Sequence, residues 1–204
     1  MLIRPERVVQ WMNLVRQTSE DTQYRVLENF WGSQISSKCW MIDSIKQHLQ
    51  LSPGLAYIMG GWYGVSAQFM SDNFPILDSV VSVDVDPQAE LFGTLLSKIN
   101  DNNDYNILFK TSDMESFTNY FQASIIINTS TEHITQKVFD TWRDNLPENV
   151  PIVLQGNNLF NCEDHIRCST SLEAFNESNF LSKIIYTDSL LCGDFYRFMT
   201  IGYK

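Results

Sequence analysis

The chain has 204 residues and a formal net charge of −10 at pH 7, from 14 Lys and Arg against 24 Asp and Glu. Its hydrophobic fraction of 44% excludes wholesale disorder. No stretch reaches the ~18 consecutive apolar residues of a membrane span, and the N-terminus lacks the apolar core of a signal peptide, so we expect a soluble, cytoplasmic protein.

Charge and cysteine content also restrict the partners. A domain that binds nucleic acid usually shows clustered Lys and Arg. Here these residues are few and scattered, so nucleic acid is not expected as a partner. A small-molecule or protein substrate fits better. The four cysteines, Cys39, Cys162, Cys168 and Cys192, follow no regular spacing, which favours reduced thiols over a disulfide framework.

Residues 1–50 are predicted to form a helical N-terminal cap. Apolar side chains recur at helical spacing over residues 7–16, and a second helix is expected over residues 23–30. Ser36 and Ser37 offer an N-cap for a third helix, which the Ser52-Pro53-Gly54 sequence ends.

From residue 51 to residue 204, short apolar runs alternate with helix-compatible segments. This alternation predicts an α/β fold in which helices flank a doubly wound, mostly parallel seven-stranded sheet, with an antiparallel last strand. We therefore expect one Rossmann-like domain over residues 51–204. The predicted strands cover residues 55–59, 79–83, 105–109, 123–127, 150–154, 183–186 and 195–201. The predicted helices cover residues 65–70, 87–99, 115–121, 135–145 and 172–175, and residues 187–194 join the last two strands.

Three glycines directly follow the first predicted strand and precede a helix. Gly60, Gly61 and Gly64 allow a tight turn and a close approach of a ligand to the backbone. The helix N-terminus adds free N–H groups and a positive partial charge. This pattern suits a nucleotide or an amino-acid carboxylate, but an ordinary strand-to-helix turn would show the same glycines.

Acidic residues follow the next two strands. Asp84 lies 20 residues after Gly64, where a carboxylate in nucleotide-binding sheets accepts hydrogen bonds from ribose hydroxyls. Helix capping is the alternative for Asp84, but we assign that role to its neighbour Asp86. After the third strand, Asp113 could accept a hydrogen bond from an adenine amino group, and Met114 could pack on the ring. The alternative for Asp113 is a cap on the helix predicted over residues 115–121.

In this order, Gly60-Gly61-Trp62-Tyr63-Gly64, Asp84, Asp113 and Asn128 resemble the motifs of class I S-adenosylmethionine-dependent methyltransferases. The resemblance covers about residues 50–204. It implies S-adenosylmethionine as cofactor, with its methionine part at Gly60, Gly61, Trp62 and Gly64, its ribose at Asp84, its adenine at Asp113 and Met114, and its methyl group beside Asn128.

Two departures from the family pattern leave alternatives open. Ile58 stands where the family usually has an acid, and Trp62 stands where it has its middle glycine. A non-catalytic module that binds S-adenosylmethionine or a nucleotide, or an enzyme that cleaves the cofactor, therefore remain as alternatives. A dehydrogenase fits less well, because the glycines do not complete a G-x-G-x-x-G spacing.

Candidate catalytic residues follow strands four and five. Glu132 and His133 lie where the loop would face the methyl group and could deprotonate an acceptor. The alternative is that the Ser and Thr residues of this loop cap the next helix and that Glu132 interacts with the dipole of its first turn. His165 lies in a polar segment suited to orienting a substrate. Cys162, His165 and Cys168 have a C-x2-H-x2-C spacing that is not a common zinc pattern, so no metal is expected.

The N-terminal helices are expected to cover the site. Trp31, Lys38 and Trp40 could line an acceptor pocket, although aromatic residues at such spacing more often belong to a core.

Overall fold

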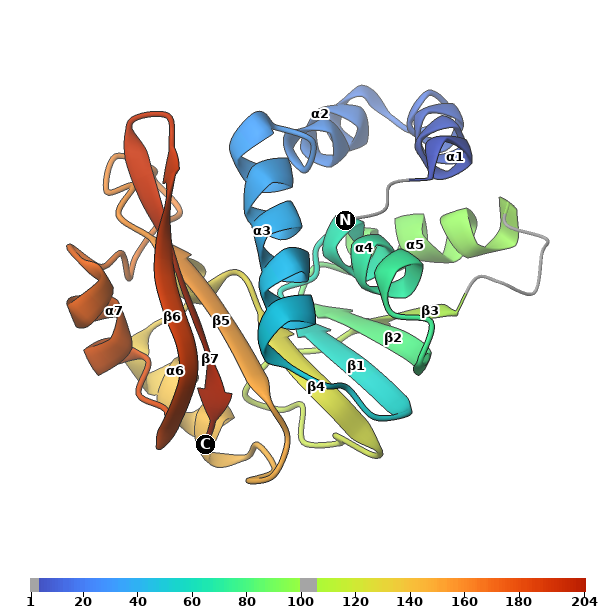
Figure 1. Ribbon diagram of the computed structural model, residues 1–204. Helices are drawn as coiled ribbons and strands as arrows, with labels where there is room; N and C mark the ends of the chain where they lie inside the picture. Colours follow the sequence, from blue (N-terminus) through green and yellow to red (C-terminus); the bar gives the residue numbers. More distant parts are fainter. Residues whose placement is uncertain (1–3, 100–105) are drawn as a thin grey trace.

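The computed structural model describes residues 4–99 and 106–204 and contains one seven-stranded sheet, with the strand order β3-β2-β1-β4-β5-β7-β6 (Figure 1). β7 runs antiparallel to β5 and β6, and β1 to β5 pair in parallel. The predicted α/β fold with an antiparallel last strand is therefore confirmed. The strands are β1 (Gly54–Met59), β2 (Leu77–Asp84), β3 (Ile107–Thr111), β4 (Ala123–Asn128), β5 (Ile152–Asn157), β6 (Lys183–Cys192) and β7 (Phe195–Tyr203).

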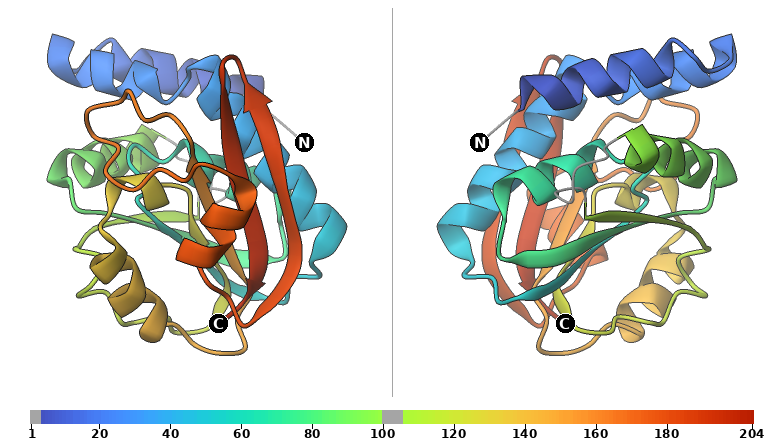
Figure 2. Two further views of the ribbon diagram at one scale, coloured as in Figure 1. Left: turned by 90° about the vertical axis from the view of Figure 1, so that its left-hand side faces the viewer. Right: turned by 90° about the vertical axis from the view of Figure 1, so that its right-hand side faces the viewer.

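Helices cover both faces of this sheet (Figure 2). β4 shows the division best, because Ile125 and Ile127 join the core beneath α3, α4 and α5, whereas Ile126 joins the core beneath α6 and α7. A central strand buried on both faces accounts for its continuous apolar run. The helices are α1 (Pro5–Val15), α2 (Glu20–Glu28), α3 (Gly32–His48), α4 (Val65–Asn73), α5 (Pro87–Ile99), α6 (Gln136–Asp144) and α7 (Leu172–Ser178), with a 3₁₀ turn η1 (Thr131–His133).

The first three helices share one hydrophobic core with the sheet. The Trp11 ring of α1 lies 5.3 Å from the rings of both Phe30 and Phe92, which joins the N-terminal helices to α5. The expected N-cap of the third helix is wrong, because α3 already begins at Gly32 and Ser37 donates its hydroxyl to the Gln34 carbonyl. The domain boundary after residue 50 stays a prediction.

No helix forms over residues 115–121, where one was predicted. Asp113 Oδ1 accepts a hydrogen bond from the Glu115 N–H, and Asn119 Oδ1 accepts one from the Phe121 N–H. Such local side-chain acceptors favour turns over helix. The Tyr120 ring instead packs 5.3 Å from the Tyr57 ring, which fixes this segment against the sheet.

The two final strands form a longer hairpin than predicted. β6 continues to Cys192, so only Gly193 and Asp194 separate it from β7, and the expected link over residues 187–194 is wrong. Gly193 has a φ of +72°, a left-handed conformation that suits a tight hairpin turn. The prediction ended this strand at residue 186 because Thr187, Asp188 and Ser189 are polar residues on the edge of the sheet.

The predicted strand over residues 105–109 lies partly outside the described residues, because the structure describes β3 only from Ile107 and leaves residue 105 undescribed. None of the helices within residues 4–99 and 106–204 has the length and apolar composition to cross a membrane.

The Phe109 side chain in the middle of β3 fills the space that two glycines leave. A Cβ on Gly64 would lie 2.5 Å from the Phe109 ring, and a Cβ on Gly93 of α5 would also collide with that ring. Phe109 therefore sets the approach of both α4 and α5 to the sheet.

We expect Gly93→Ala to destabilise the protein by about 1–2 kcal/mol, because overpacking outweighs the better helix propensity of alanine. In a Phe109→Ala background, the same substitution should instead stabilise by up to ~1 kcal/mol. Denaturant unfolding of the four proteins in this double-mutant cycle measures the change of sign; an equal effect in both backgrounds would show that Phe109 is not the obstacle.

Candidate functional site

The loop after β1 adopts the left-handed conformations that its glycines suggest. Gly60 has a φ of +62° and Gly64 a φ of +90°. Trp62 also has a positive φ, +45°, although it carries a side chain. Its indole is partly buried against the core and lies 5.7 Å from the Tyr63 ring. The backbone path therefore matches a glycine turn, and the tryptophan follows it at a steric cost.

Asp84 at the end of β2 is tied to this loop. Its Oδ2 accepts a hydrogen bond from the Trp62 N–H at 2.7 Å, and its Oδ1 accepts one from the Asp86 N–H at 3.0 Å. Asp86 itself caps α5, since its Oδ1 accepts from the Gln88 N–H at 2.9 Å, and it pairs with Arg25 of α2. The capping assignment of Asp86 is confirmed, whereas ribose binding by Asp84 stays a prediction.

The residues after β3 and β4 meet at the same edge of the sheet. Asn128 is fully buried; its Nδ2 donates to the Met114 sulfur at 3.5 Å, and its Oδ1 accepts from the Ser130 N–H at 2.9 Å. The Ser130 hydroxyl then donates to the Gly60 carbonyl at 3.3 Å. Asp113 is exposed and caps no helix, because none follows it. Its adenine role remains a prediction.

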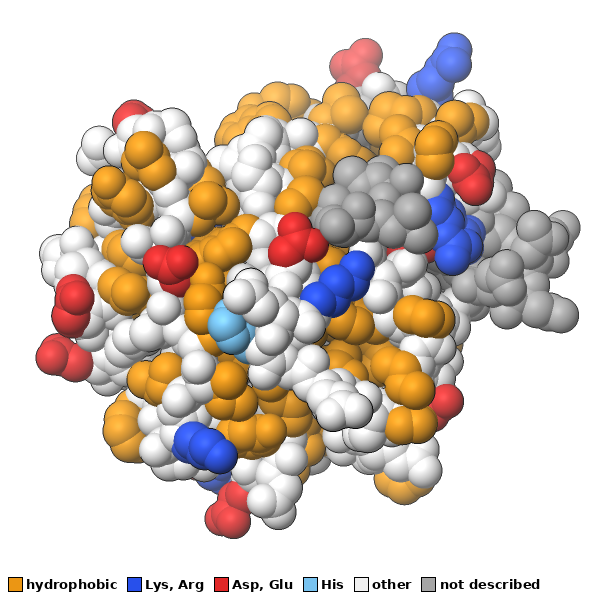
Figure 3. All heavy atoms as spheres, viewed as in Figure 1, with side chains coloured by type: hydrophobic (Ala, Val, Ile, Leu, Met, Phe, Trp, Pro, Cys, Tyr) orange, Lys and Arg blue, Asp and Glu red, His pale blue; other side chains and the backbone are white. Residues whose placement is uncertain are grey.

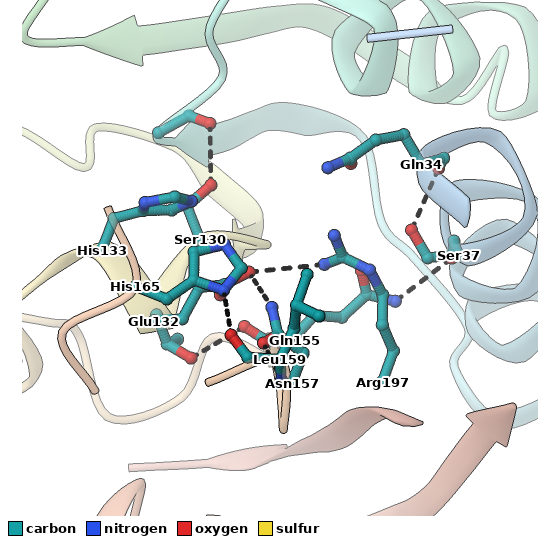
Figure 4. Close-up of polar contacts among 12 residues, drawn as sticks. Gln34, Ser37, Ser130, Glu132, His133, Gln155, Asn157, Leu159, His165 and Arg197 are labelled. Carbon is teal, nitrogen blue, oxygen red and sulfur yellow. Dashed lines mark hydrogen bonds and ion pairs between the residues drawn. The ribbon is translucent and has the colours of Figure 1, made fainter. Parts of the chain in front are cut away.

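Glu132, His133 and His165, the three predicted catalytic residues, come together (Figure 4). One side-chain oxygen of Glu132 and one ring nitrogen of each histidine lie within 4.8 Å of one another, and the two imidazole rings meet edge to face with their centres 4.8 Å apart. Thr135 caps α6 by accepting from the Val138 N–H, and α6 begins only at Gln136. Glu132 lies in η1 and therefore not in the first turn of α6.

Arg167 joins the two segments that carry these residues. Its Nε donates to the Thr131 carbonyl at 3.2 Å, and its Nη2 donates to Asn179 Oδ1 at 2.8 Å. The guanidinium lies 4.6 Å from the centre of the Phe139 ring. The Glu132 carbonyl also accepts the backbone N–H groups of Ile166 and Arg167. Burial lowers the pKa of Arg167 to about 10. The sequence analysis missed this residue, because nothing in its local sequence marks a clamp between two loops.

A buried ion pair lies behind Glu132. Arg197 of β7 places Nη1 3.6 Å from Glu132 Oε1, and both side chains are at most 5% exposed. Asn157 Nδ2 donates to the same carboxylate oxygen at 2.5 Å. Three buried atoms here have no hydrogen-bond partner, namely Glu132 Oε2, Arg197 Nε and Gln155 Oε1. Unsatisfied buried polar atoms are costly, so their grouping marks this region as a candidate binding site.

Lys38 of α3 is a further ionisable residue close to the buried pair of Glu132 and Arg197. Its Nζ donates to Gln34 Oε1 at 2.7 Å, and the residue is 6% exposed. Burial lowers the pKa of Lys38 to about 7, assisted by the positive charge of Arg197 and opposed by Glu132. Of the other two predicted pocket residues, Trp31 is 58% exposed, and Trp40 donates its indole N–H to the Tyr186 hydroxyl.

Of the two cysteines near His165 in the sequence, Cys168 contacts its ring. Cys168 Sγ lies 3.8 Å from His165 Nδ1, and burial raises the pKa of Cys168 to about 11, which keeps the thiol protonated at neutral pH. Burial lowers the pKa of His165, with Glu132 opposing the shift. Among the described residues, the group with metal-binding geometry contains Glu132 and two histidines rather than Cys162 and Cys168.

Known structures resemble this fold closely, although their sequences differ. The N-methyltransferase NodS from Bradyrhizobium japonicum WM9, in complex with S-adenosyl-L-homocysteine, has a TM-score of 0.65 at 11% identity over 96% of this chain and 98% of its own. YcgJ from Bacillus subtilis has a TM-score of 0.62 at 15% identity, over 83% of this chain and 98% of its own.

A geranyl diphosphate C-methyltransferase from Streptomyces coelicolor A3(2) has a TM-score of 0.62 at 12% identity, over 81% of this chain and 78% of its own. No protein-family profile and no curated protein sequence matches the chain. The chain therefore has the class I methyltransferase fold, as the sequence resemblance implied.

Replacing Lys38 should change how stability depends on pH. Between pH 7 and the ordinary lysine pKa of 10.5, Lys38 is protonated in the unfolded chain but neutral in the folded one. Lys38 therefore lowers the free energy of unfolding most at or below pH 7, and this penalty decreases as the pH rises. We expect Lys38→Met to raise the melting temperature most at or below pH 7, and progressively less toward pH 10.

Thermal unfolding of wild type, Lys38→Met and Lys38→Gln across this pH range measures the effect. The neutral Lys38→Gln variant should show the same trend, and a difference from wild type that stays constant with pH would contradict the lowered pKa.

Proposed function

We propose that the chain is an S-adenosylmethionine-dependent methyltransferase that acts on a small-molecule or protein acceptor. The observation that carries the proposal is the meeting of the glycine loop, Asp84 and the Asn128–His133 segment at one edge of a class I methyltransferase fold. Two of the similar structures, NodS and the geranyl diphosphate C-methyltransferase, were solved with S-adenosyl-L-homocysteine, the product form of this cofactor.

The residues present fit the cofactor. α4 begins after Gly64 without a side-chain cap, so its first N–H groups remain available for the carboxylate of a methionine moiety. Each Asp84 oxygen accepts one backbone N–H and keeps a second lone pair for a ribose hydroxyl. Asp113 is exposed beside Met114, in keeping with contacts to an adenine ring. Gly60, Gly61 and Trp62 would border the methionine part.

When bound, the cofactor supplies an electrophilic methyl group on a sulfonium, and the protein must align an acceptor with it. Asn128, held by Met114 and Ser130, would lie beside that methyl group. As long as no metal ion occupies this group, Glu132 and His133 would take a proton from an acceptor that carries one, and His165 would orient the acceptor. Alignment supplies much of the rate in such a displacement, and a positioned base adds typically about 10²–10⁴-fold.

The charge distribution favours acceptors other than nucleic acid. On the face shown in Figure 3, Lys and Arg side chains stand apart from one another and form no basic patch. The buried charges of Lys38, Arg197 and Glu132 instead gather next to the proposed acceptor site. Such an arrangement suits a polar small molecule or a protein side chain.

Two observations favour a second candidate, a non-catalytic module that binds S-adenosylmethionine or a nucleotide. Both Asp84 oxygens already accept backbone N–H groups, and Trp62 occupies the position of a glycine. Incubation with S-adenosylmethionine separates the candidates. S-Adenosylhomocysteine formed only with an acceptor mixture supports transfer, cleavage products formed without any acceptor indicate a cofactor-cleaving enzyme, and binding without turnover supports the module.

We expect S-adenosylhomocysteine to bind the wild-type chain in isothermal titration calorimetry. Asp84→Asn should weaken this binding by about 1–3 kcal/mol, or about 5- to 150-fold, because a charge-assisted hydrogen bond to ribose is lost. Asp86→Asn is the matched control: it alters the α5 cap and the Arg25 pair two residues away and should leave the affinity within about twofold. No heat from folded wild-type protein would end the cofactor proposal, and equal effects of both variants would remove Asp84 from the site.

A further inference from the structure

We propose that Glu132, His133 and His165 form a binding site for one divalent first-row transition-metal ion, of which Zn²⁺ is the representative case. A carboxylate and two imidazoles are a common ligand set for such ions, and they leave coordination positions open for water or substrate. The three donor atoms lie within 4.8 Å of one another. Atoms bound to one ion at about 2.1 Å lie up to about 4.2 Å apart, so a small movement of these side chains would bring all three donor atoms within binding distance of one ion.

The histidines are already oriented for metal binding. His133 Nδ1 lies 3.1 Å from the Asp164 carbonyl oxygen, and His165 Nδ1 lies 3.0 Å from the Leu159 carbonyl oxygen. A carbonyl oxygen only accepts hydrogen bonds, so both Nδ1 atoms carry the proton and both Nε2 atoms keep their lone pairs. Metal-binding histidines typically have this second hydrogen bond, which fixes the tautomer and the ring.

The third donor is a buried carboxylate with one free oxygen. Glu132 is 1% exposed, and its Oε2 has no partner. Its other oxygen is held by Asn157 at 2.5 Å and faces Arg197 at 3.6 Å. The guanidinium therefore neutralises one side of the carboxylate, and the unpartnered oxygen remains for a cation on the other. A buried, unsatisfied carboxylate oxygen is costly, and coordination to an ion would remove that cost.

Contacts of residues other than the three ligands hold the two ligand-bearing segments together. Arg167 bridges the loop of His165 to η1, which carries Glu132 and His133, and the Glu132 carbonyl accepts two N–H groups from the same loop. These contacts connect residues 132 and 165 without any ion. The ligands are therefore largely pre-positioned, which lowers the entropy cost of binding a metal.

Titration of the chelator-treated, full-length chain with Zn²⁺ tests the proposal by calorimetry, without cofactor. We expect one ion per chain, much weaker binding of Mn²⁺ in line with the usual order of affinities, and a loss of about tenfold or more in Zn²⁺ affinity for both His133→Ala and Glu132→Gln. His133→Ala removes an exposed ring and leaves the buried ion pair intact. If Glu132→Gln fails to fold, the Zn²⁺ affinity of His133→Ala alone tests the proposal. Asp164→Asn removes a neighbouring exposed carboxylate and should leave the affinity within about twofold.

Absorption spectra of the Co²⁺-loaded chain identify the ligands independently. Bands of nitrogen and oxygen coordination without thiolate charge transfer are expected, and they should be lost in His133→Ala but kept in Cys168→Ala. No Zn²⁺ binding by the folded wild type, an equal loss in Asp164→Asn, or a thiolate band that Cys168→Ala removes would each overturn the proposal. Because the titrations contain no cofactor, failure to bind S-adenosylhomocysteine leaves this result unaffected, and the converse also holds.

Discussion

The parallel pairing of β1 with β4 is the constraint on which the candidate site depends. The chain leaves β1 toward β2 and β3 on one side, and it returns to β4 and β5 on the other. The carboxyl ends of these strands therefore share one edge, with a crevice where the strand order changes direction. The glycine loop after β1 and the polar segment after β4 are neighbours for this reason alone, and the Ser130–Gly60 hydrogen bond joins them.

Within that edge, the polar residues form two connected groups. Asp84 fixes the glycine loop through the Trp62 N–H, which completes the part of the edge proposed to hold a cofactor. Arg167 and Arg197 fix the other group, the first by bridging two loops and the second by pairing with the buried carboxylate of Glu132. The strain of a tryptophan in a left-handed conformation and the unpartnered polar atoms both occur here, which is where functional sites tend to store such costs.

Most of the fold could be predicted from the sequence, because the spacing of apolar residues and the glycines that mark turns are local signals. The prediction failed where the decisive contacts were non-local or polar. Turns at Asp113 and Asn119 replace the helix predicted over residues 115–121, and the second half of the edge strand β6 was predicted as a link because it contains polar residues. The candidate catalytic residues were predicted from their position after strands, but Arg167 connects their two segments, and its hydrogen-bond partners lie 11 to 36 positions away in the sequence. No local pattern reveals such a clamp.

The short segment from Asn128 to His133 belongs to both groups. Asn128 contacts Met114, Ser130 contacts the glycine loop, and the last two residues face His165. Since one stretch of backbone serves both sides, a ligand that reorders it from one side alters the affinity on the other, and thermodynamic linkage makes the factor the same in both directions. Order of addition would then influence rates of complex formation but never the final populations.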